Sequence, residues 1–140
     1  MMMNKAGLFF HTLCVCFVLS LFLSMMGDFK IGSLNLNGAR SDVKRASLFK
    51  LIELKKLDVI FLQETHSNLE NENDWKKEWA GEIILSHNVS NSGGVGMLFS
   101  KGFSPYSFDV EEIMCGYMLK VRVKYEDVTM NFINIYKQYA

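Results

Sequence analysis

Two runs of apolar residues in the first half of the chain predict strands. Residues 59–62, with the sequence VIFL, contain no polar break, which is typical of a short strand buried on both faces. Residues 29–38 begin with a similar mixed apolar run and predict an earlier strand that ends in polar residues. Between the two runs the pattern changes, and the predicted order is strand, helix, strand.

The connecting helix is predicted over residues 41–56. Leu48, Leu51 and Ile52 follow the i, i+3, i+4 spacing of one apolar helix face, and Ser41 is suited to the N-terminal cap. In such a crossover the two strands lie parallel, and their carboxyl ends meet at one edge of the sheet.

The second half of the chain predicts antiparallel strands. Residues 82–86 and 95–100 are strand-like, and the Gly, Asn and Ser residues at 88–94 predict a hairpin connection between them. In residues 117–125 the odd positions are apolar or aromatic, whereas Lys120, Arg122 and Lys124 occupy even positions. One face of this strand is therefore expected in the core and the other in solvent. Glu126 and Asp127 then form a turn that leads into a last strand at 128–136.

Residues 67–77 form a polar segment that predicts a surface loop with a short helix around Trp75 and Trp79. The two tryptophans are suited either to packing one helix face on the core or to stacking on nucleic-acid bases, and packing is favoured. The acidic residues of the segment are interpreted as solvated rather than metal-binding. They are Glu70, Glu72 and Asp74.

Composition indicates a single globular domain without a strong electrostatic preference for nucleic acid. Hydrophobic residues make up 49% and charged residues 21% of the 140 residues, and 15 basic residues balance 15 acidic ones. Contact with a phosphate backbone must then be local or metal-mediated. Cys14, Cys16 and Cys115, the last in a predicted strand, lack zinc-site spacing. His87 is a single histidine at a loop edge and is interpreted as structural.

Candidate chemistry follows the two predicted parallel strands. Glu64 comes directly after the buried strand, and Asn35 occupies the corresponding end of the earlier one. A carboxylate and an amide oxygen at one sheet edge are hard ligands that suit Mg²⁺.

Five motifs, in this order and spacing, carry a family resemblance. They are SLNLNG at 33–38, KR at 44–45, QETH at 63–66, GVGMLFS at 94–100 and NIY at 134–136. Together they resemble the first half of the exonuclease-endonuclease-phosphatase superfamily, in particular the endonuclease domain of LINE-type retrotransposon polyproteins. The resemblance implies an α/β (α+β) fold: the N-terminal half of a four-layer α/β/β/α sandwich with a mixed, mostly antiparallel sheet, preceded by an apolar leader helix.

The resemblance also implies a reaction and residues for it. The reaction is Mg²⁺-dependent hydrolysis of DNA phosphodiesters. The implied roles are metal ligand for Glu64 and Asn35, phosphate contact for Tyr136, support of Glu64 for His66 and Thr65, and substrate contact for Asn37, Lys120 and Arg122.

The chain departs from the family pattern after Tyr136. The later Gly-Asp-Phe-Asn and Ser-Asp-His motifs, which carry the acid that orients water and the general-base histidine, are absent from these 140 residues. We therefore expect negligible nuclease turnover. We also expect only about one of the two sheets, with an apolar face that a partner protein covers or that makes the chain poorly soluble.

Two alternatives to a nuclease fragment stay open from sequence. The chain could be a membrane-anchored, non-catalytic interaction module, which glycosylation at the Asn88 sequon would favour. It could instead be another phosphodiesterase of the same superfamily, acting on sugar phosphates or sphingolipids.

Residues 1–27 form an apolar leader, and residues 28–140 form the endonuclease-like domain. Residues 6–26 carry no charge, and the stretch is long enough to cross a bilayer as a helix. Three interpretations fit: a signal anchor, which is favoured, a cleaved signal peptide, or fortuitous upstream sequence. The first two imply a membrane or secretory location, and the third implies the nuclear or cytoplasmic location of the family.

Overall fold

The computed structural model describes residues 29–89, 92–105 and 107–137. The predicted leader helix at 1–27, with its three interpretations, lies outside the described residues. Within the described ranges, every helix is too short or too polar to span a bilayer.

The predicted parallel crossover is confirmed. Strand β1 spans Ile31–Asn35, helix α3 spans Asp42–Lys55, and strand β2 spans Val59–Gln63. β1 and β2 pair in parallel, with Ile31 opposite Val59 at one end and Asn35 opposite Gln63 at the other. All five residues of β2 are buried, as the unbroken apolar run predicts.

Two antiparallel strands complete the first sheet, which we call sheet A. β3 spans Glu82–Ser86 and β4 spans Val95–Phe99, and the loop between them contains Gly93 and Gly94 at positive φ. The strand order in sheet A is β1-β2-β4-β3. The predicted hairpin is therefore confirmed.

The remaining strands form a second sheet, sheet B, with the order β5-β6-β7. β5 spans Ser107–Met114, β6 spans Met118–Tyr125 and β7 spans Val128–Ile135. Cys115 lies in the turn between β5 and β6, so its expected place in a strand is wrong.

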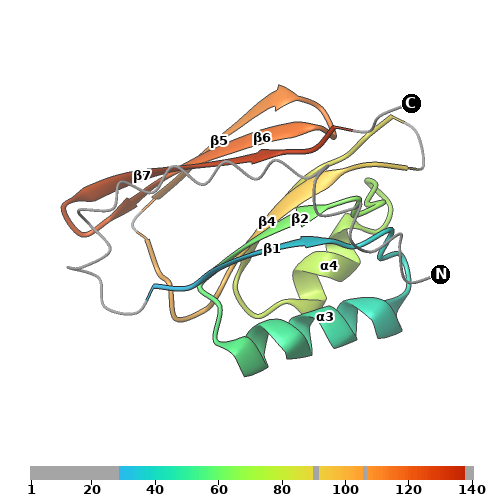
Figure 1. The fold of residues 1–140 in the computed structure, drawn as a ribbon, viewed down its shortest axis with the longest axis horizontal. Coiled ribbons are helices and arrows are strands. Elements are labelled where there is room, and N and C mark those ends of the chain that lie inside the picture. Colours follow the sequence, from blue (N-terminus) through green and yellow to red (C-terminus); the bar gives the residue numbers. More distant parts are fainter. Residues whose placement is uncertain (1–28, 90–91, 106, 138–140) are drawn as a thin grey trace, which may run out of the picture.

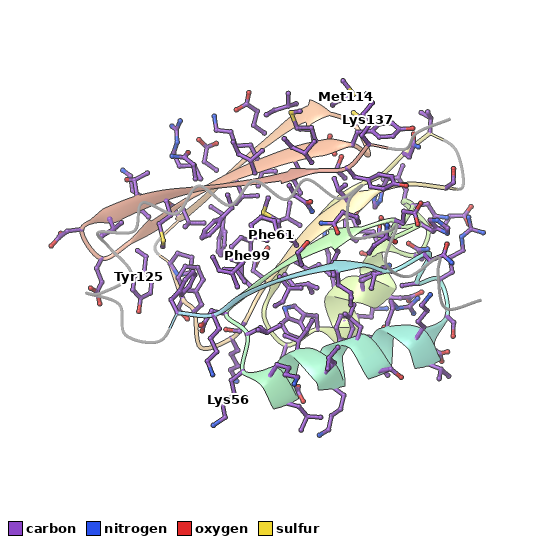
Figure 2. The ribbon with its side chains drawn as sticks, in the orientation of Figure 1. Lys56, Phe61, Phe99, Met114, Tyr125 and Lys137 are labelled. Atoms are coloured by element: carbon purple, nitrogen blue, oxygen red, sulfur yellow. The ribbon has the colours of Figure 1, made fainter. Side chains whose placement is uncertain are left out.

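The three layers are visible in Figure 1, where α3 and the short helix α4 (Glu72–Glu78) lie on one face of sheet A and sheet B covers the other. Phe61 and Phe99 lie between the two sheets in Figure 2 and are fully buried. The expectation that the chain supplies only one sheet is wrong. β6 and β7 each have one apolar face, and that face is buried only by packing on sheet A.

The helix layer corrects one local prediction. The buried face of α3 consists of Arg45, Leu48, Phe49 and Ile52, whereas Leu51 is 43% exposed. These four residues follow i, i+3, i+4, i+7 spacing, and Arg45 is the first of them. A charged residue can be buried at this position because its guanidinium is paired with Glu78 of α4.

The ends of the helices show two further outcomes. Ser41 occupies the N-cap position of α3 but makes no capping hydrogen bond with its side chain. Trp75 and Trp79 are 0% and 6% exposed and pack on Phe49, which confirms the core interpretation and excludes base stacking in this conformation.

Candidate functional site

The segments that follow β1 and β2 continue side by side beyond the sheet. The N–H groups of Leu36, Gly38 and Ala39 donate to the carbonyl oxygens of Gln63, Glu64 and Thr65, at 2.8, 2.7 and 3.0 Å. The last paired residue of β1 is Asn35, opposite Gln63. Asn35 and Glu64 therefore lie on the same edge of sheet A, which we call the rim.

The backbone at the rim is strained at three residues. Asn37, Glu64 and His66 have φ values of 49°, 51° and 52°, in the left-handed region. Residues other than glycine adopt this region at a cost on the order of 1–2 kcal/mol each. The hydrogen bonds between the two segments offset this cost, and such strain is common where a protein fixes a functional side chain.

Glu64 contacts sheet B through a single hydrogen bond. The phenol of Tyr136, which directly follows β7, donates to Glu64 Oε1, although the two residues are 72 positions apart. Burial of the phenol, followed by its hydrogen bond to the Glu64 carboxylate and the charge of that group, raises the pKa of Tyr136 well above its ordinary value of 10. The phenol is therefore protonated at neutral pH and fixes one carboxylate oxygen of Glu64.

The amide of Asn35 is partly engaged. Its Oδ1 accepts the N–H of Asn37 at 3.0 Å, which closes a tight turn at the end of β1. An amide oxygen has two lone pairs, so one of them is left for a further bond. Asn37 itself is exposed at the rim.

Two buried amides lie directly below Glu64 and join the sheets. Gln63 Nε2 donates to Asn134 Oδ1 at 2.9 Å, and both residues are 0% exposed. Asn134 Nδ2 donates to the carbonyl oxygens of Leu62 and Gly96, at 2.9 Å each. Because these polar groups satisfy one another in an apolar layer, they fix the position of β7 and Tyr136 relative to β2.

His66 and Thr65 flank Glu64 on the other side. The imidazole of His66 lies against Gly38, where a Cβ atom would be 2.4 Å from His66 Nδ1. Thr65 is fully buried, and its Oγ1 is 2.9 Å from Ser67 Oγ. Their predicted support of Glu64 stays a prediction, because the side-chain contacts seen here are with Gly38 and Ser67.

Lys120 and Arg122 are not brought to the rim. Their side chains lie on the outer face of sheet B, opposite the face that contains Tyr136 and the core. Lys120 Nζ is 3.1 Å from Glu111 Oε2, and Arg122 Nε donates to Asn131 Oδ1 at 3.2 Å. Their predicted contact with substrate stays a prediction, and it would involve a surface separate from Glu64.

The donor set at the rim fits a magnesium ion. Among the described residues, no group of three or more His, Cys, Asp or Glu side chains is placed to hold a metal. Mg²⁺ is commonly bound by one or two protein carboxylates together with water and substrate phosphate. The Glu64 carboxylate and the Asn35 amide oxygen are suited to this mode.

The fold and this rim define a class of nuclease- and phosphatase-like domains built as α/β sandwiches. Residues 32–132 match the sequence profile of the Endonuclease/Exonuclease/phosphatase family. The chain is also 34% identical over 106 residues to the Transposon TX1 uncharacterized 149 kDa protein of Xenopus laevis. The chain belongs to the Endonuclease/Exonuclease/phosphatase family, and enzymes of this family generally depend on a divalent metal.

Solved structures agree on the fold. The crystal structure of TDP2 from C. elegans superposes with a TM-score of 0.55 at 18% identity and covers 89% of this chain. A truncated Caenorhabditis elegans TDP2 gives a TM-score of 0.50 at 18% identity over 73% of this chain. The chain spans 42% of each TDP2 structure, and the match with the transposon protein covers 76% of this chain but 8% of the relative.

The family predicted from sequence is confirmed, and the transposon relative agrees with the predicted retroelement relationship. The sequence does not predict the buried amide pair of Gln63 and Asn134. One signal for the amides is present in the sequence, since Asn134 occupies the apolar phase of its strand, where Met130 and Phe132 are buried. A polar residue in that phase requires a buried partner.

Proposed function

We propose that residues 28–140 are the N-terminal part of a Mg²⁺-dependent DNA endonuclease domain, and that this part supplies the metal and phosphate contacts of the reaction. The contact between Glu64 and Tyr136 carries the proposal. It joins the ends of two sheets at the rim where Asn35 terminates β1.

Each rim residue has a defined task in this proposal. Glu64 and Asn35 would hold the ion through oxygen atoms, and Tyr136 orients the Glu64 carboxylate through its hydrogen bond. When bound, Mg²⁺ would supply polarisation of the phosphoryl group and stabilise the leaving oxygen. The raised pKa of Tyr136 keeps its phenol neutral, so it adds no second negative charge beside a phosphate.

The same 140 residues are expected to bind without efficient turnover. No aspartate follows Asp127 and no histidine follows His87 in the sequence. A positioned general base contributes roughly 10²–10⁴-fold to such reactions, and an acid that orients it contributes further. We therefore propose that this polypeptide binds metal and phosphate but cleaves DNA negligibly by itself.

The relative from a transposon favours DNA over lipid or sugar phosphate as the substrate class. The basic residues Lys120 and Arg122 would add a contact with the DNA backbone along the outer face of sheet B. We propose this contact in addition to the metal site. Each of the two side chains would exchange its present polar partner for a DNA phosphate.

The proposal is tested by measuring binding and cleavage with the same protein. We expect the purified chain to bind Mn²⁺, used as a probe for Mg²⁺, and Glu64→Ala to lose that binding. Nicking of supercoiled plasmid in Mg²⁺ is expected to be the same for both proteins. Nicking that Glu64→Ala abolishes would contradict the proposed inactivity, and absence of Mn²⁺ binding to the unmodified chain would contradict the metal site. Lys50→Ala, a change at an exposed residue of α3, serves as the matched control.

A further inference from the structure

A chain of side-chain hydrogen bonds runs from the rim to helix α4. Thr65 Oγ1 is 2.9 Å from Ser67 Oγ, and Ser67 Oγ is 2.8 Å from His87 Nδ1. On the other side of the imidazole, His87 Nε2 is 2.9 Å from Glu72 Oε2. The chain thus links the segment after β2, the loop after β3 and the first turn of α4.

The order serine, imidazole, carboxylate is also that of a hydrolytic triad, but Ser67 is not suited to attack a substrate. The residue is only 4% exposed, and its Oγ contacts both Thr65 and His87. A nucleophile must be reachable by the reacting carbon or phosphorus atom. The chain of hydrogen bonds therefore has a role inside the protein.

The carboxylate of Glu72 fixes the donor at one end of this row of hydrogen bonds. A carboxylate accepts only, so His87 Nε2 carries a proton and donates to Glu72. The other ring nitrogen, Nδ1, shares a hydrogen bond with Ser67 Oγ, which shares another with Thr65 Oγ1. Thr65 Oγ1 in turn accepts the N–H of Ser67 at 3.3 Å. Every hydroxyl in the chain has a defined partner.

The segment held in this way contains the strained residues Glu64 and His66, on either side of Thr65. Backbone bonds attach the segment to the β3–β4 loop: Thr65 N donates to Gly94 O at 3.2 Å, and His66 N donates to Gly93 O at 2.9 Å. Gly94 makes close approach to Thr65 possible, because a Cβ atom at this position would be 2.5 Å from Thr65 Oγ1. The hydroxyl of Thr65 is therefore confined between the loop and Ser67.

We infer that Ser67, His87 and Glu72 are positioning residues for Glu64: they hold the strained segment so that its carboxylate stays at the rim beside Asn35. The inference rests on the proposed metal-binding function of Glu64. Residues that orient a metal ligand typically change metal affinity by about 10–100-fold when removed.

The test compares Ser67→Ala, His87→Ala and Glu72→Ala in the full 140-residue chain, purified in a mild detergent. We expect each to weaken Mn²⁺ binding by about tenfold or more. Glu72→Gln keeps an acceptor for His87 and is expected to restore most of the affinity. Two control variants remove neighbouring interactions of α4: Lys76→Ala, which deletes the other ion pair of Glu72, and Glu78→Gln, which weakens the pair with Arg45. Both are expected to keep the affinity of the unmodified chain.

A second measurement separates positioning from metal binding. Hydrogen exchange of the Gly38 and Ala39 amides reports on the contact between the two rim segments without any metal. We expect faster exchange at these amides in the three alanine variants and not in the controls.

The outcomes are distinct. Unchanged Mn²⁺ affinity and unchanged exchange in the alanine variants would overturn the inference, even if the melting temperature falls. Equal loss of affinity in the controls would also overturn it, because the effect would then follow stability alone. If the unmodified chain binds no Mn²⁺, the proposed function fails, and faster exchange at Gly38 and Ala39 would then support a positioning role in the segment without a metal.

Discussion

The two faces of sheet A are both covered, yet they bury different kinds of polar group. On the face toward sheet B, the amides of Gln63 and Asn134 are fully buried and neutral. On the face toward the helices, Arg45 is paired with Glu78, whose side chain is 31% exposed. The amides lie directly below Glu64 and Tyr136, whereas Glu78 lies at the end of α4, close to water.

This difference predicts different consequences when the buried amides or the ion pair are changed. Fully buried amides that bond to one another and to backbone carbonyls tolerate little displacement, so they fix the relative position of the two sheets at the rim. An ion pair at the edge of a layer is screened by solvent and contributes less to stability. Changes to the sheet-side amides are therefore expected to affect both stability and the site, and changes to the Arg45–Glu78 pair mainly stability.

The largest effect is expected for Asn134→Leu. The variant removes two hydrogen bonds to the carbonyls of Leu62 and Gly96 and leaves Gln63 without its amide partner. We expect the free energy of unfolding to fall by about 3 kcal/mol, measured by urea denaturation. The double variant Gln63→Leu/Asn134→Leu is expected to recover part of the loss, because both polar partners are then replaced. A double variant that is less stable than Asn134→Leu would contradict this account.

An alkaline titration tests the hydrogen bond from Tyr136 to Glu64, the other polar contact between sheet A and the segment after β7. The pKa of Tyr136 is raised in the folded protein, so its stabilising effect is complete below pH 10 and is lost as the pH rises toward the folded pKa. In that range, wild type is expected to lose about 1.4 kcal/mol per pH unit more than Tyr136→Phe. Parallel stability curves for the two proteins between pH 9 and 11 would show that the phenol is not held in this way.

A smaller effect is expected for Glu78→Gln on the helix side. The change removes the charge from a carboxylate that accepts two hydrogen bonds from Arg45. We expect a loss of about 1 kcal/mol in the free energy of unfolding, because the glutamine still accepts one bond and Glu78 is partly exposed. A loss as large as that of Asn134→Leu would remove the contrast between the two faces.

The smallest effect is expected on acidification. The hydrogen bond from Lys76, and to a lesser extent that from His87, lowers the pKa of Glu72 below its ordinary value of 4.5, against the effect of burial. The stabilising effect of the ionised Glu72 carboxylate on the fold is therefore complete above pH 4.5, and it is lost as the pH falls through the pKa of the folded protein. Compared with wild type, Glu72→Gln is expected to be less stable by a few tenths of a kcal/mol at pH 7 and equally stable at pH 2. Thermal melts at the two pH values check this.

The sequence predicts the elements of this molecule better than their partners. β2 is recognised because its apolar run is unbroken, and the β3–β4 hairpin is recognised because Gly93 and Gly94 mark its loop. The face of α3 is less accurate, since Leu51 is exposed and Arg45 is buried. A buried arginine depends on a partner 33 residues away, which local spacing does not reveal.

The candidate site shows the same limit. The sequence predicts Glu64 and Asn35 at one edge, because the rule for parallel crossovers fixes where both strands end. The contacts of His87 were not predicted, because its partners Ser67 and Glu72 come from two other segments and no local pattern joins them. The polar pattern predicts a solvated Glu72, whereas its side chain is 24% exposed and bonded to two residues.

Strand β7 forms one border of sheet B, and its backbone groups on that side have no neighbouring strand in the described part of the chain. The eight residues of Val128–Ile135 include no charge and no proline, the two features that normally prevent one molecule from adding its strand to another. Where this border is uncovered, a second molecule can add a strand to β7. Self-association would then begin at β7 rather than at an uncovered sheet face.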